Sequence, residues 1–463
     1  MNDFEEDITM PVSPMGQYFK SSVLSVSIIS VLEFESPLDD SQAMALIKDV
    51  FLPINTRFSS IMIEDKNGIK RWKQVEMNIN EHVKFPIFPT DTSLKFYDEY
   101  LDEYMTKISM ETFPQDKPLW EMHMIKYPTC NAAGTVIFKL HHSLGDGYSL
   151  MGALFACLQR ADDCSLPMNF PSSRAVESKG ISSKLSQAVS LIFGSVFDFG
   201  WSLLKGNVIE DDQTPLRSGY EDVELRPITI SNVTVSLDSI KEVKDKLKVS
   251  TNDVLVGIVF LGIRLYMEKM DNKSSKAETT ALVLLNTRNI RGYKSVKDML
   301  DTNSEAPWGN RLAFLHIPIP KLSNTSSWNP LEFVLKASKF IKRQRFSLAV
   351  PLMGLFLDLV KKIKGPEGAA RYVYKTLKNS SLTISHMIGP VEQVALANNS
   401  IKSLYFMNVG LPQSLAITIT SYMGYSRVSI GAEKGFIDGH QFKSCLENSF
   451  EVILKAARHA HCH

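Results

Sequence analysis

The stretch GTVIFKLHHSLGDGYS, residues 134–149, decides how the fold is interpreted. Its first seven residues are mostly apolar and alternate in a way that predicts a strand with one apolar face. Two of the 10 histidines in the chain follow side by side at the end of this strand. Strand alternation places His142 with the apolar face and His141 on the opposite face. The pair is therefore poorly arranged to chelate a single metal ion.

An acidic turn separates this strand from a predicted helix over Tyr148–Ala161. Gly145 and Gly147 flank Asp146 and permit a tight turn or positive φ angles there. A histidine held at a strand end beside such a carboxylate is positioned to act as a general base. The alternative is a buried histidine whose ring nitrogens are satisfied within the core.

The composition indicates a folded globular protein. The chain has 463 residues, of which 44% are hydrophobic and 22% charged. This length exceeds what one core usually holds, so two lobes are expected. The 51 basic and 50 acidic residues nearly cancel, so net charge gives no argument for a nucleic-acid partner.

Five cysteines without a CxxC pair favour neither a disulfide framework nor a zinc site, and they suggest a reducing compartment. The acidic N-terminus lacks a signal-peptide pattern, so we expect the protein to begin in the cytosol.

Strand and helix patterns occupy two long stretches with a polar linker between them. Residues 1–165 are predicted to form an N-terminal α/β lobe that carries HHSLGDG. Residues 166–226 are rich in turn formers and charged residues and predict an interlobe linker. Residues 227–463 resume the alternation and predict a C-terminal lobe of comparable size. The predicted fold class is α/β (α+β), with two lobes joined by a crossover linker.

The linker contains an apolar segment, Leu185–Leu204, bounded by Lys184 and Lys205. On a helical wheel most of its large apolar residues gather on one side, and Asp198 falls opposite. In the middle of a membrane-spanning helix Asp198 would cost about 2.5–3.5 kcal/mol, which favours an amphipathic helix lying in the membrane plane. In that arrangement the two lysines lie at the headgroups and Trp201 lies near the interface. The alternative is a helix packed on the protein's own surface.

A second apolar segment with basic ends, Lys342–Lys364, contains Pro351. Proline at this point argues against a straight membrane helix. The segment is compatible with a core, a tunnel wall or a membrane contact, and its basic ends with binding of CoA phosphates. The sequence leaves these alternatives open.

The pattern His-His-x-x-x-Asp-Gly at residues 141–147 resembles the HHxxxDG signature of the coenzyme-A-dependent acyltransferase superfamily. Four further stretches accompany this motif: PVSPMGQYF (11–19), DKPLWEMHMI (116–125), TNDVLVGIVF (251–260) and LLNTR (284–288). In this order along nearly the whole chain, they resemble the wax ester synthase/diacylglycerol acyltransferase family, particularly its plant members. A BAHD acyltransferase would carry DFGWG close to its C-terminus. The nearest likeness here is APWGN at 306–310, in the wrong place, which counts against that branch.

The resemblance implies roles for the motif residues. His142 would be the general base that takes the proton from the acceptor hydroxyl, and His141 would support it. Asp146 would turn away from the substrate, pair with an arginine and shape the loop. Arg288, at the end of an apolar strand, is the candidate partner; Gly147 completes the motif.

Several of these positions have structural alternatives. Asn252 either belongs to the first turn of a helix or offers its amide to the thioester or the motif loop. Arg288 either pairs with Asp146 or is a solvent-exposed residue at a strand end. Thr383 and Ser385 are candidates for a hydroxyl donor to the oxyanion.

The resemblance implies a two-lobed fold with an interlobe tunnel and the motif at its midpoint. It implies an O-acyltransferase that transfers a long-chain acyl group from acyl-CoA to a fatty alcohol, with diacylglycerol as a further acceptor. No acyl-enzyme, metal or cofactor is implied beyond acyl-CoA as co-substrate. Lipid substrates imply contact with a membrane surface, expected at the cytosolic face of the endoplasmic reticulum, with the plasma membrane as the alternative. Two other functions stay open: a soluble BAHD-like acyltransferase of small alcohols, and a non-catalytic lipid-binding relative.

Overall fold

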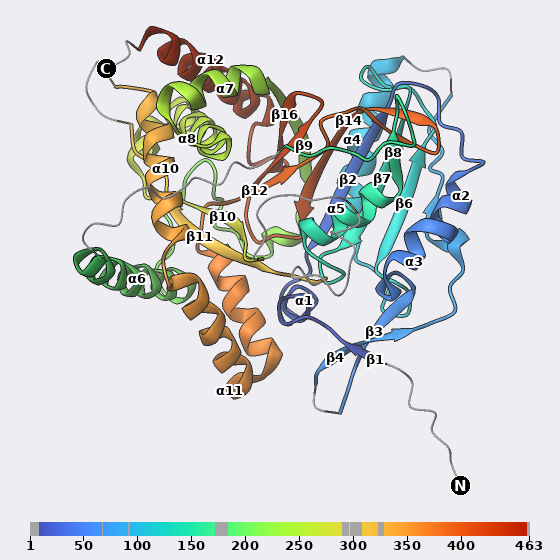
Figure 1. The fold of residues 1–463 in the computed structure, drawn as a ribbon, viewed down its shortest axis with the longest axis horizontal. Coiled ribbons are helices and arrows are strands. Elements are labelled where there is room, and N and C mark those ends of the chain that lie inside the picture. Colours follow the sequence, from blue (N-terminus) through green and yellow to red (C-terminus); the bar gives the residue numbers. More distant parts are fainter. Residues whose placement is uncertain are drawn as a thin grey trace.

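The computed structural model describes most of the chain in side-chain detail. The described residues are 9–66, 68–90, 93–171, 184–288, 296, 308–322 and 328–460, with only the backbone for 184–193. Two sheets lie side by side, each with helices packed on it, and helix α1 (Pro14–Phe19) lies where the two halves meet (Figure 1). This is the two-lobed mixed architecture that the sequence predicts.

The first sheet has seven strands in the order β5-β6-β7-β2-β14-β13-β8, antiparallel except for the β5–β6 pair. The strands are β2 (Ser27–Phe34), β5 (Val83–Lys84), β6 (Trp120–Ile125), β7 (Gly134–His141), β8 (Leu158–Arg160), β13 (Val394–Leu396) and β14 (Asn399–Val409). Strand β7 lies inside this sheet and is buried along its whole length. Because β13 and β14 come from the last quarter of the chain, the part after residue 227 contributes to both sheets.

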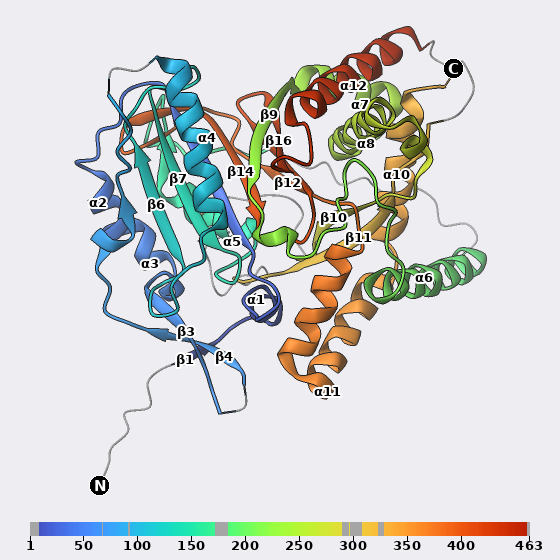
Figure 2. The same cartoon turned by 180° about the vertical axis from the view of Figure 1, so that it is seen from behind.

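Helices cover both faces of this sheet, so β7 is buried on its apolar face and also on the opposite face, which includes Lys139. Helix α4 (Leu94–Met110) packs on the face of Ile137, and α5 (Gly147–Ala156) packs on the face of Phe138 and Leu140 (Figure 2). The predicted helix over Tyr148–Ala161 is too long. Residues 158–160 form β8 and pair with β13, a long-range partner that local periodicity cannot reveal.

The second sheet has six strands in the order β11-β10-β12-β15-β16-β9, with β12 parallel to β10 and β15. The strands are β9 (Ile228–Ser236), β10 (Thr280–Asn286), β11 (Leu312–Pro318), β12 (Leu382–Ile388), β15 (Leu415–Tyr422) and β16 (Tyr425–Glu433). One face is covered by α7 (Leu237–Leu247), α8 (Thr251–Met270), α10 (Leu331–Arg345) and α12 (Gly439–His459) (Figure 1). Helix α8 is buried on nearly all sides because α10 and α12 both pack on it.

Smaller elements complete the fold. A three-stranded sheet joins β1 (Thr9–Pro11), β4 (Lys70–Gln74) and β3 (Ser60–Glu64). Short helical turns are α2 (Ala43–Leu46), η1 (Ile47–Phe51), α3 (Leu52–Ile54), η2 (Thr56–Ser59), η3 (Ile79–Glu81), η4 (Val223–Leu225) and η5 (Asn272–Lys276).

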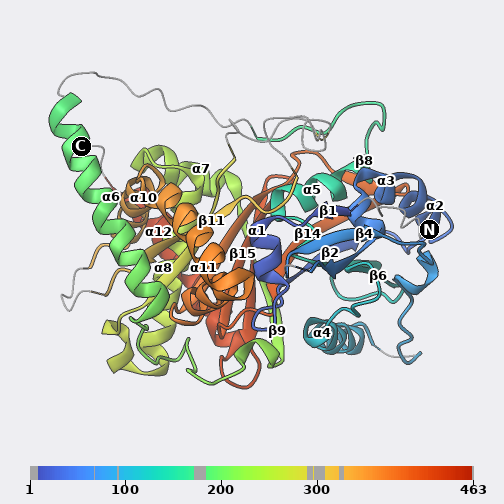
Figure 3. The ribbon, with the colours of Figure 1, turned by 90° about the horizontal axis from the view of Figure 1, so that it is seen from below.

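Helices α6 (Lys184–Asn207) and α11 (Ala349–Lys378) pack against each other beside the second sheet (Figure 3). The prediction of a helix over Leu185–Leu204 is confirmed by α6. Pro351 does not interrupt a helix, because it lies in the first turn of α11, where proline is tolerated. The breaks lie instead at residues 346–348, between α10 and α11, and at Gly365, whose φ of 71° interrupts α11.

The polar side of α6 faces the protein. Asp198 accepts a hydrogen bond from Arg343 of α10 at 2.5 Å, and the Leu348 N–H donates to Ser195 Oγ at 2.9 Å. The apolar residues Val196 and Phe197 are 60% and 64% exposed. The helix therefore packs on the protein, as the alternative interpretation expects, but it directs apolar side chains outward.

Lys205 does not lie at a headgroup position as the sequence suggests. Its side chain is buried and donates to Asp211 at 2.5 Å. A buried ammonium needs such a partner, and Asp211 also accepts from the N–H and hydroxyl of Thr280 and Ser381. The lysine thus fixes the end of α6 to the second sheet.

Within the described part of the chain, no single helix is long and apolar enough to cross a membrane. Helices α7 and α8 meet that threshold only as a pair, with a bend of 100° between them.

Helix α8 crosses α10 so closely at Gly257 that a side chain there would collide with backbone. A Cβ at this position would lie 2.6 Å from Val334 Cα. We expect Gly257→Ala to lower the free energy of unfolding by about 1–3 kcal/mol, because overpacking forces the two helices apart. Thermal unfolding measures this loss. Gly200→Ala in α6, where a Cβ would meet nothing within 4 Å, should be neutral or stabilising. A melting temperature for Gly257→Ala at or above that of the parent protein would contradict the close crossing.

Candidate active site

The motif occupies the end of β7 and the start of α5. The His142 N–H donates to the Val26 carbonyl at 2.9 Å, which keeps the chain against β2 for one residue beyond the strand. Asp146 then begins α5, because its carboxylate accepts from the Ser149 N–H at 3.1 Å as an N-cap. His141, His142 and Asp146 are all buried. The strand and the cap therefore fix the motif on both sides.

Asn310 holds the His142 ring through two contacts. Its amide Nδ2 donates to the His142 carbonyl at 2.8 Å, so its Oδ1 is the atom that faces His142 Nδ1 at 2.8 Å. An oxygen accepts, so Nδ1 carries the proton and Nε2 keeps a lone pair. The ring also packs on Phe19, with 4.6 Å between centroids. Asn310 thus selects the tautomer in which Nε2 can accept a proton.

The electrostatic surroundings keep His142 neutral. Burial lowers the pKa of His142 below its ordinary value, although Asp146 and the bond to Asn310 oppose this shift. A neutral imidazole is the form that can act as a general base.

His141 has different partners. Its Nδ1 accepts from the Ser143 N–H at 3.1 Å, and its Nε2 lies 3.3 Å from Ser25 Oγ. Both ring nitrogens are therefore engaged in the loop and in the segment before β2. Burial, with Lys20 nearby, holds the pKa of His141 well below its ordinary value. The arrangement suits a residue that supports the loop.

The structure brings Asp146 and Arg288 together. Arg288 donates from Nη1 to Asp146 Oδ2 at 2.5 Å, and the Arg311 N–H donates to the same oxygen at 2.8 Å. Arg288 also donates from Nη2 to the Gly309 carbonyl at 2.6 Å and to Ser149 Oγ at 3.0 Å. Arg288 is buried, so the alternative of a solvent-exposed strand end is wrong.

The glycines of the motif serve close packing. Neither Gly145 nor Gly147 has a positive φ, so that part of the expectation is wrong. A Cβ on Gly147 would lie 2.6 Å from Met387 Sδ, and one on Gly145 would lie 2.9 Å from Ser149 Cβ. A side chain at Gly147 would therefore displace the Met387 side chain of β12, and one at Gly145 would collide with the first turn of α5.

Asn252 contacts another histidine. Ser250 is the N-cap of α8 and forms a capping box with Asp253, so Asn252 belongs to the first turn of the helix, as one of the two alternatives expects. The Asn252 Oδ1 lies 3.1 Å from Nδ1 of His386 on β12, and burial lowers the pKa of His386 to about 4. His386 precedes Met387, which packs on Gly147. Asn252 therefore reaches the motif only indirectly, through β12.

The segment Trp308–Arg311 is the part of the site that sequence reasoning missed. Trp308 Nε1 donates to the Leu144 carbonyl at 2.8 Å, and Asn310 and Arg311 bind His142 and Asp146 as described above. The sequence shows this segment only as APWGN, which lacks the DFGWG pattern. A Trp-Gly-Asn run directly before an apolar strand is the signal that could have drawn attention to it.

A cavity of about 690 Å³ begins at this segment and lies between β11, α11, α6 and α1. Its size suits a small-molecule or lipid ligand. Near the motif it is lined by Trp308 and Asn310, and elsewhere by apolar residues of β11 and α11 such as Phe314 and Leu357. Asn310 therefore contacts both His142 and the cavity.

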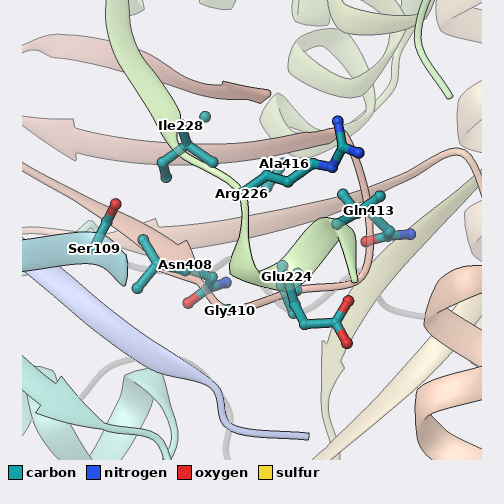
Figure 4. Close-up of a pocket in the computed structure, with 12 residues that line it drawn as sticks. Ser109, Glu224, Arg226, Ile228, Asn408, Gly410, Gln413 and Ala416 are labelled. Atoms are coloured by element: carbon teal, nitrogen blue, oxygen red, sulfur yellow. The ribbon is translucent and has the colours of Figure 1, made fainter. Parts of the chain in front are cut away.

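A second, much smaller pocket lies between the lobes beside Asn408 and Gln413 (Figure 4). Its volume of about 20 Å³ holds little more than one water molecule. Gln413 Oε1 accepts the hydroxyl of Thr383 at 2.6 Å. Because that hydroxyl is already donated to Gln413, Thr383 is poorly placed to serve an oxyanion at His142. The described residues contain no cluster of three or more potential metal ligands.

The hydrogen bond from Asn310 makes the protonation of His142 testable by NMR of labelled imidazoles. We expect Asn310→Asp to raise the pKa of His142, because a carboxylate beside Nδ1 favours the protonated ring. The matched control is Asn252→Asp, which should raise the pKa of His386 and leave His142 unchanged. An unshifted His142 in Asn310→Asp would show that residue 310 does not govern the ring.

Comparisons with known proteins agree with this architecture. Two family models match: the wax ester synthase/diacylglycerol acyltransferase catalytic domain at residues 55–255 and the WS/DGAT C-terminal domain at residues 308–454. Similar curated proteins are wax ester synthase/diacylglycerol acyltransferases 4 and 11 of Arabidopsis thaliana. The first is 28% identical over 98% of this chain and 91% of the relative, and the second 29% identical over 96% and 95%.

Solved structures show the same fold. The wax ester synthase/diacylglycerol acyltransferase of Marinobacter aquaeolei VT8 matches with a TM-score of 0.61 at 14% identity, covering 97% of this chain and 100% of that one. The starter condensation domain of rhizomide synthetase, in complex with C8-CoA, matches with a TM-score of 0.56 at 11% identity, covering 98% and 95%. The two family models together span the motif, the Trp308–Arg311 segment and most of both sheets. The chain belongs to the wax ester synthase/diacylglycerol acyltransferase family.

Proposed function

We propose that the protein transfers a long-chain acyl group from acyl-CoA to a fatty alcohol, and to diacylglycerol as a second acceptor. The observation that carries this proposal is the clamp of Asn310 on His142, made by a residue that also lines the lipid-sized cavity. The clamp leaves His142 Nε2 with a lone pair. Fatty alcohol ranks ahead of diacylglycerol by family resemblance.

The proposed reaction needs one proton acceptor. The hydroxyl oxygen of the alcohol attacks the thioester carbonyl carbon while His142 Nε2 takes the hydroxyl proton. The resulting tetrahedral intermediate breaks its bond to sulfur, and His142 returns the proton to the departing CoA thiolate. General-base assistance of this kind accelerates a reaction about 10²–10⁴-fold. Both substrates meet at the site, so no acyl-enzyme and no cofactor beyond acyl-CoA are required.

Purified protein with palmitoyl-CoA and either hexadecanol or diacylglycerol tests the activity directly. We expect the ester product, and we expect His142→Ala to lower kcat about 10²–10⁴-fold because the base is lost. His440→Ala, at an exposed histidine of α12, is the matched control and should retain activity. Product formation that survives His142→Ala would exclude His142 as the base.

The pH dependence and the acceptor range distinguish the alternatives. Protonated His142 cannot act as a base. Because burial lowers the pKa of His142 below its ordinary value of 6.5, the loss of kcat/KM on acidification should have its midpoint at a pH below 6.5. Turnover of small alcohols alone would favour a soluble BAHD-like enzyme. Binding of lipid without turnover would favour a non-catalytic relative.

We further propose that an apolar ridge brings the protein to a membrane surface. The ridge consists of exposed residues of α6, the α10–α11 turn and α11: Val196, Phe197, Phe346, Leu348, Leu355, Leu359 and Ile363. The guanidinium of Arg343 lies 5.6 Å from the centre of the Phe197 ring, and the Leu348 N–H donates a hydrogen bond to Ser195 Oγ. The ridge residues of α6 and those of the α10–α11 turn are therefore neighbours.

The chemistry of the ridge suits an anionic lipid surface. Leu355, Leu359 and Ile363 follow at helical spacing, so they share one side of α11. The exposed basic residues Lys342, Arg345, Lys362 and Lys364 flank the ridge. Basic residues near a membrane surface contribute roughly 1 kcal/mol each. This supports an in-plane contact, which we place at the cytosolic face of the endoplasmic reticulum, with the plasma membrane as the alternative.

Flotation with vesicles of phosphatidylcholine and phosphatidylserine tests the ridge. The double variant Phe197→Glu with Leu359→Glu should remain in the soluble fraction, because insertion of the ridge would place two carboxylates in the apolar part of the lipid surface. Ile87→Glu replaces a 91% exposed isoleucine outside the ridge and should float like the parent protein. Flotation of the double variant with the vesicles would refute the ridge as the contact.

A further inference from the structure

The far end of the large cavity contains a histidine whose ring has no hydrogen-bond partner among the described residues. His316 on β11 is 3% exposed, and within the part of the chain that the structure describes both of its ring nitrogens lack a partner. It shares a face of β11 with Leu312 and Phe314, and all three line the cavity. Ile317 and Leu315 belong to the core cluster on the opposite face, beneath the helices, and of these two only Leu315 also borders the cavity. The imidazole therefore lies on the cavity side of the strand.

Three other polar side chains that line the cavity, those of Tyr372, Thr376 and Gln344, have partners within the protein. The Tyr372 hydroxyl donates to the Ser202 carbonyl at 3.3 Å, and the Thr376 hydroxyl donates to the Tyr372 carbonyl at 2.9 Å. Gln344 Nε2 donates to the backbone carbonyl of His316 at 2.5 Å, which leaves the His316 ring unaffected. His316 is thus a polar side chain lining the cavity that lacks its hydrogen bonds. Buried polar groups normally have partners, so this pair of nitrogens points to a ligand.

The free ring selects a particular kind of ligand. A neutral imidazole offers one donor and one acceptor, and a hydroxyl can satisfy both. Burial, with Lys205 nearby, lowers the pKa of His316 to about 4, although Asp211 opposes the shift. The ring is therefore neutral near pH 7 and offers no positive charge for a carboxylate or phosphate to pair with. A neutral oxygen-bearing group is the suitable partner.

The position of His316 matches the length of a lipid chain. His316 lies six positions after Asn310, which is beside the motif, and this spacing corresponds to at most about 20 Å of extended chain. One leaflet of a bilayer contributes roughly 15 Å of hydrocarbon. Apolar residues, among them Leu312 and Phe314, line the space between the two ends. A long chain that reacts at His142 would therefore bring its far end close to His316.

We propose that His316 recognises a second, neutral hydroxyl at the far end of a long-chain substrate. This inference rests on the proposed acyltransfer function and specifies one of its substrates: a chain with oxygen at both ends. The hydroxylated chain is either the alcohol, as an α,ω-diol, or the acyl group, as an ω-hydroxyacyl thioester. Hydroxyl recognition adds no chemical step to the reaction, because the second hydroxyl only binds.

Paired substrates test the proposal and identify the chain. One arm compares hexadecane-1,16-diol with hexadecanol as acceptor for palmitoyl-CoA, and the other compares ω-hydroxypalmitoyl-CoA with palmitoyl-CoA as donor for hexadecanol. After correction for the two equivalent hydroxyls of the diol, we expect kcat/KM to favour the hydroxylated substrate by about 10–100-fold in one arm. The arm that shows the preference identifies the chain that lies in the cavity.

Substitution of His316 links the preference to the ring. His316→Leu should reduce the ratio towards one, mainly through a higher KM for the hydroxylated substrate, and His316→Asn should restore part of it because an amide also donates and accepts. His440→Leu makes the same replacement on the surface of α12 and should keep the parent ratio.

The outcomes separate the two proposals. If the parent protein esterifies neither acceptor, the proposed function fails. If hexadecanol is esterified and both ratios are one in the parent protein, the proposed function stands and hydroxyl recognition is overturned, the far end then holding only water. A ratio that persists in His316→Leu also overturns it. The parent ratios alone decide the matter if His316→Leu does not fold.

Discussion

The ion pair between Asp146 and Arg288 is the interaction on which the site depends. Both side chains are buried, and each uses several atoms: the carboxylate accepts from Arg288, Ser149 and Arg311, and the guanidinium also holds the Gly309 carbonyl. A buried pair of this kind adds little net stability, but loss of one partner leaves an uncompensated charge that costs about 3–5 kcal/mol. The ion pair matters because it positions other residues. It fixes residues 309–311 of the second lobe against the motif of the first lobe, and so brings Asn310 to His142.

The alternation of residues along β7 and the HHxxxDG signature together predict the part of the site formed by residues 141–147. Alternation along β7 separates His141 from His142, and the two rings do have different partners. The resemblance assigns Asp146 an arginine partner, and Arg288 is that residue in the structure. Asn310 was beyond reach because it is 168 positions from His142, and nothing in one sequence states which distant amide meets a ring. The roles of the glycines were misjudged for the same reason, since the close neighbour of Gly147 is Met387 on another strand.

The fold shows the same division between local and distant information. Individual strands and helices follow from periodicity, and so does the two-lobed class. The order of strands does not follow from periodicity. Strands β13 and β14 belong to the second half of the chain but complete the first sheet, and β8 forms only because it pairs with β13. The orientation of α6 is a further case. A helical wheel identifies its two sides, but the partner that buries Asp198 is Arg343, 145 positions away.

The break at Gly365 divides α11 into two parts with different surroundings. Residues after it, such as Ala369 and Val373, are fixed in the core between the sheets, whereas Leu355 and Leu359 before it are exposed to solvent. A Cβ at Gly365 would touch nothing within 4 Å, so the joint is unobstructed. The outer part also forms a wall of the large cavity. The cavity is therefore bounded by both parts of α11, by the solvent-exposed part before Gly365 and by the buried part after it.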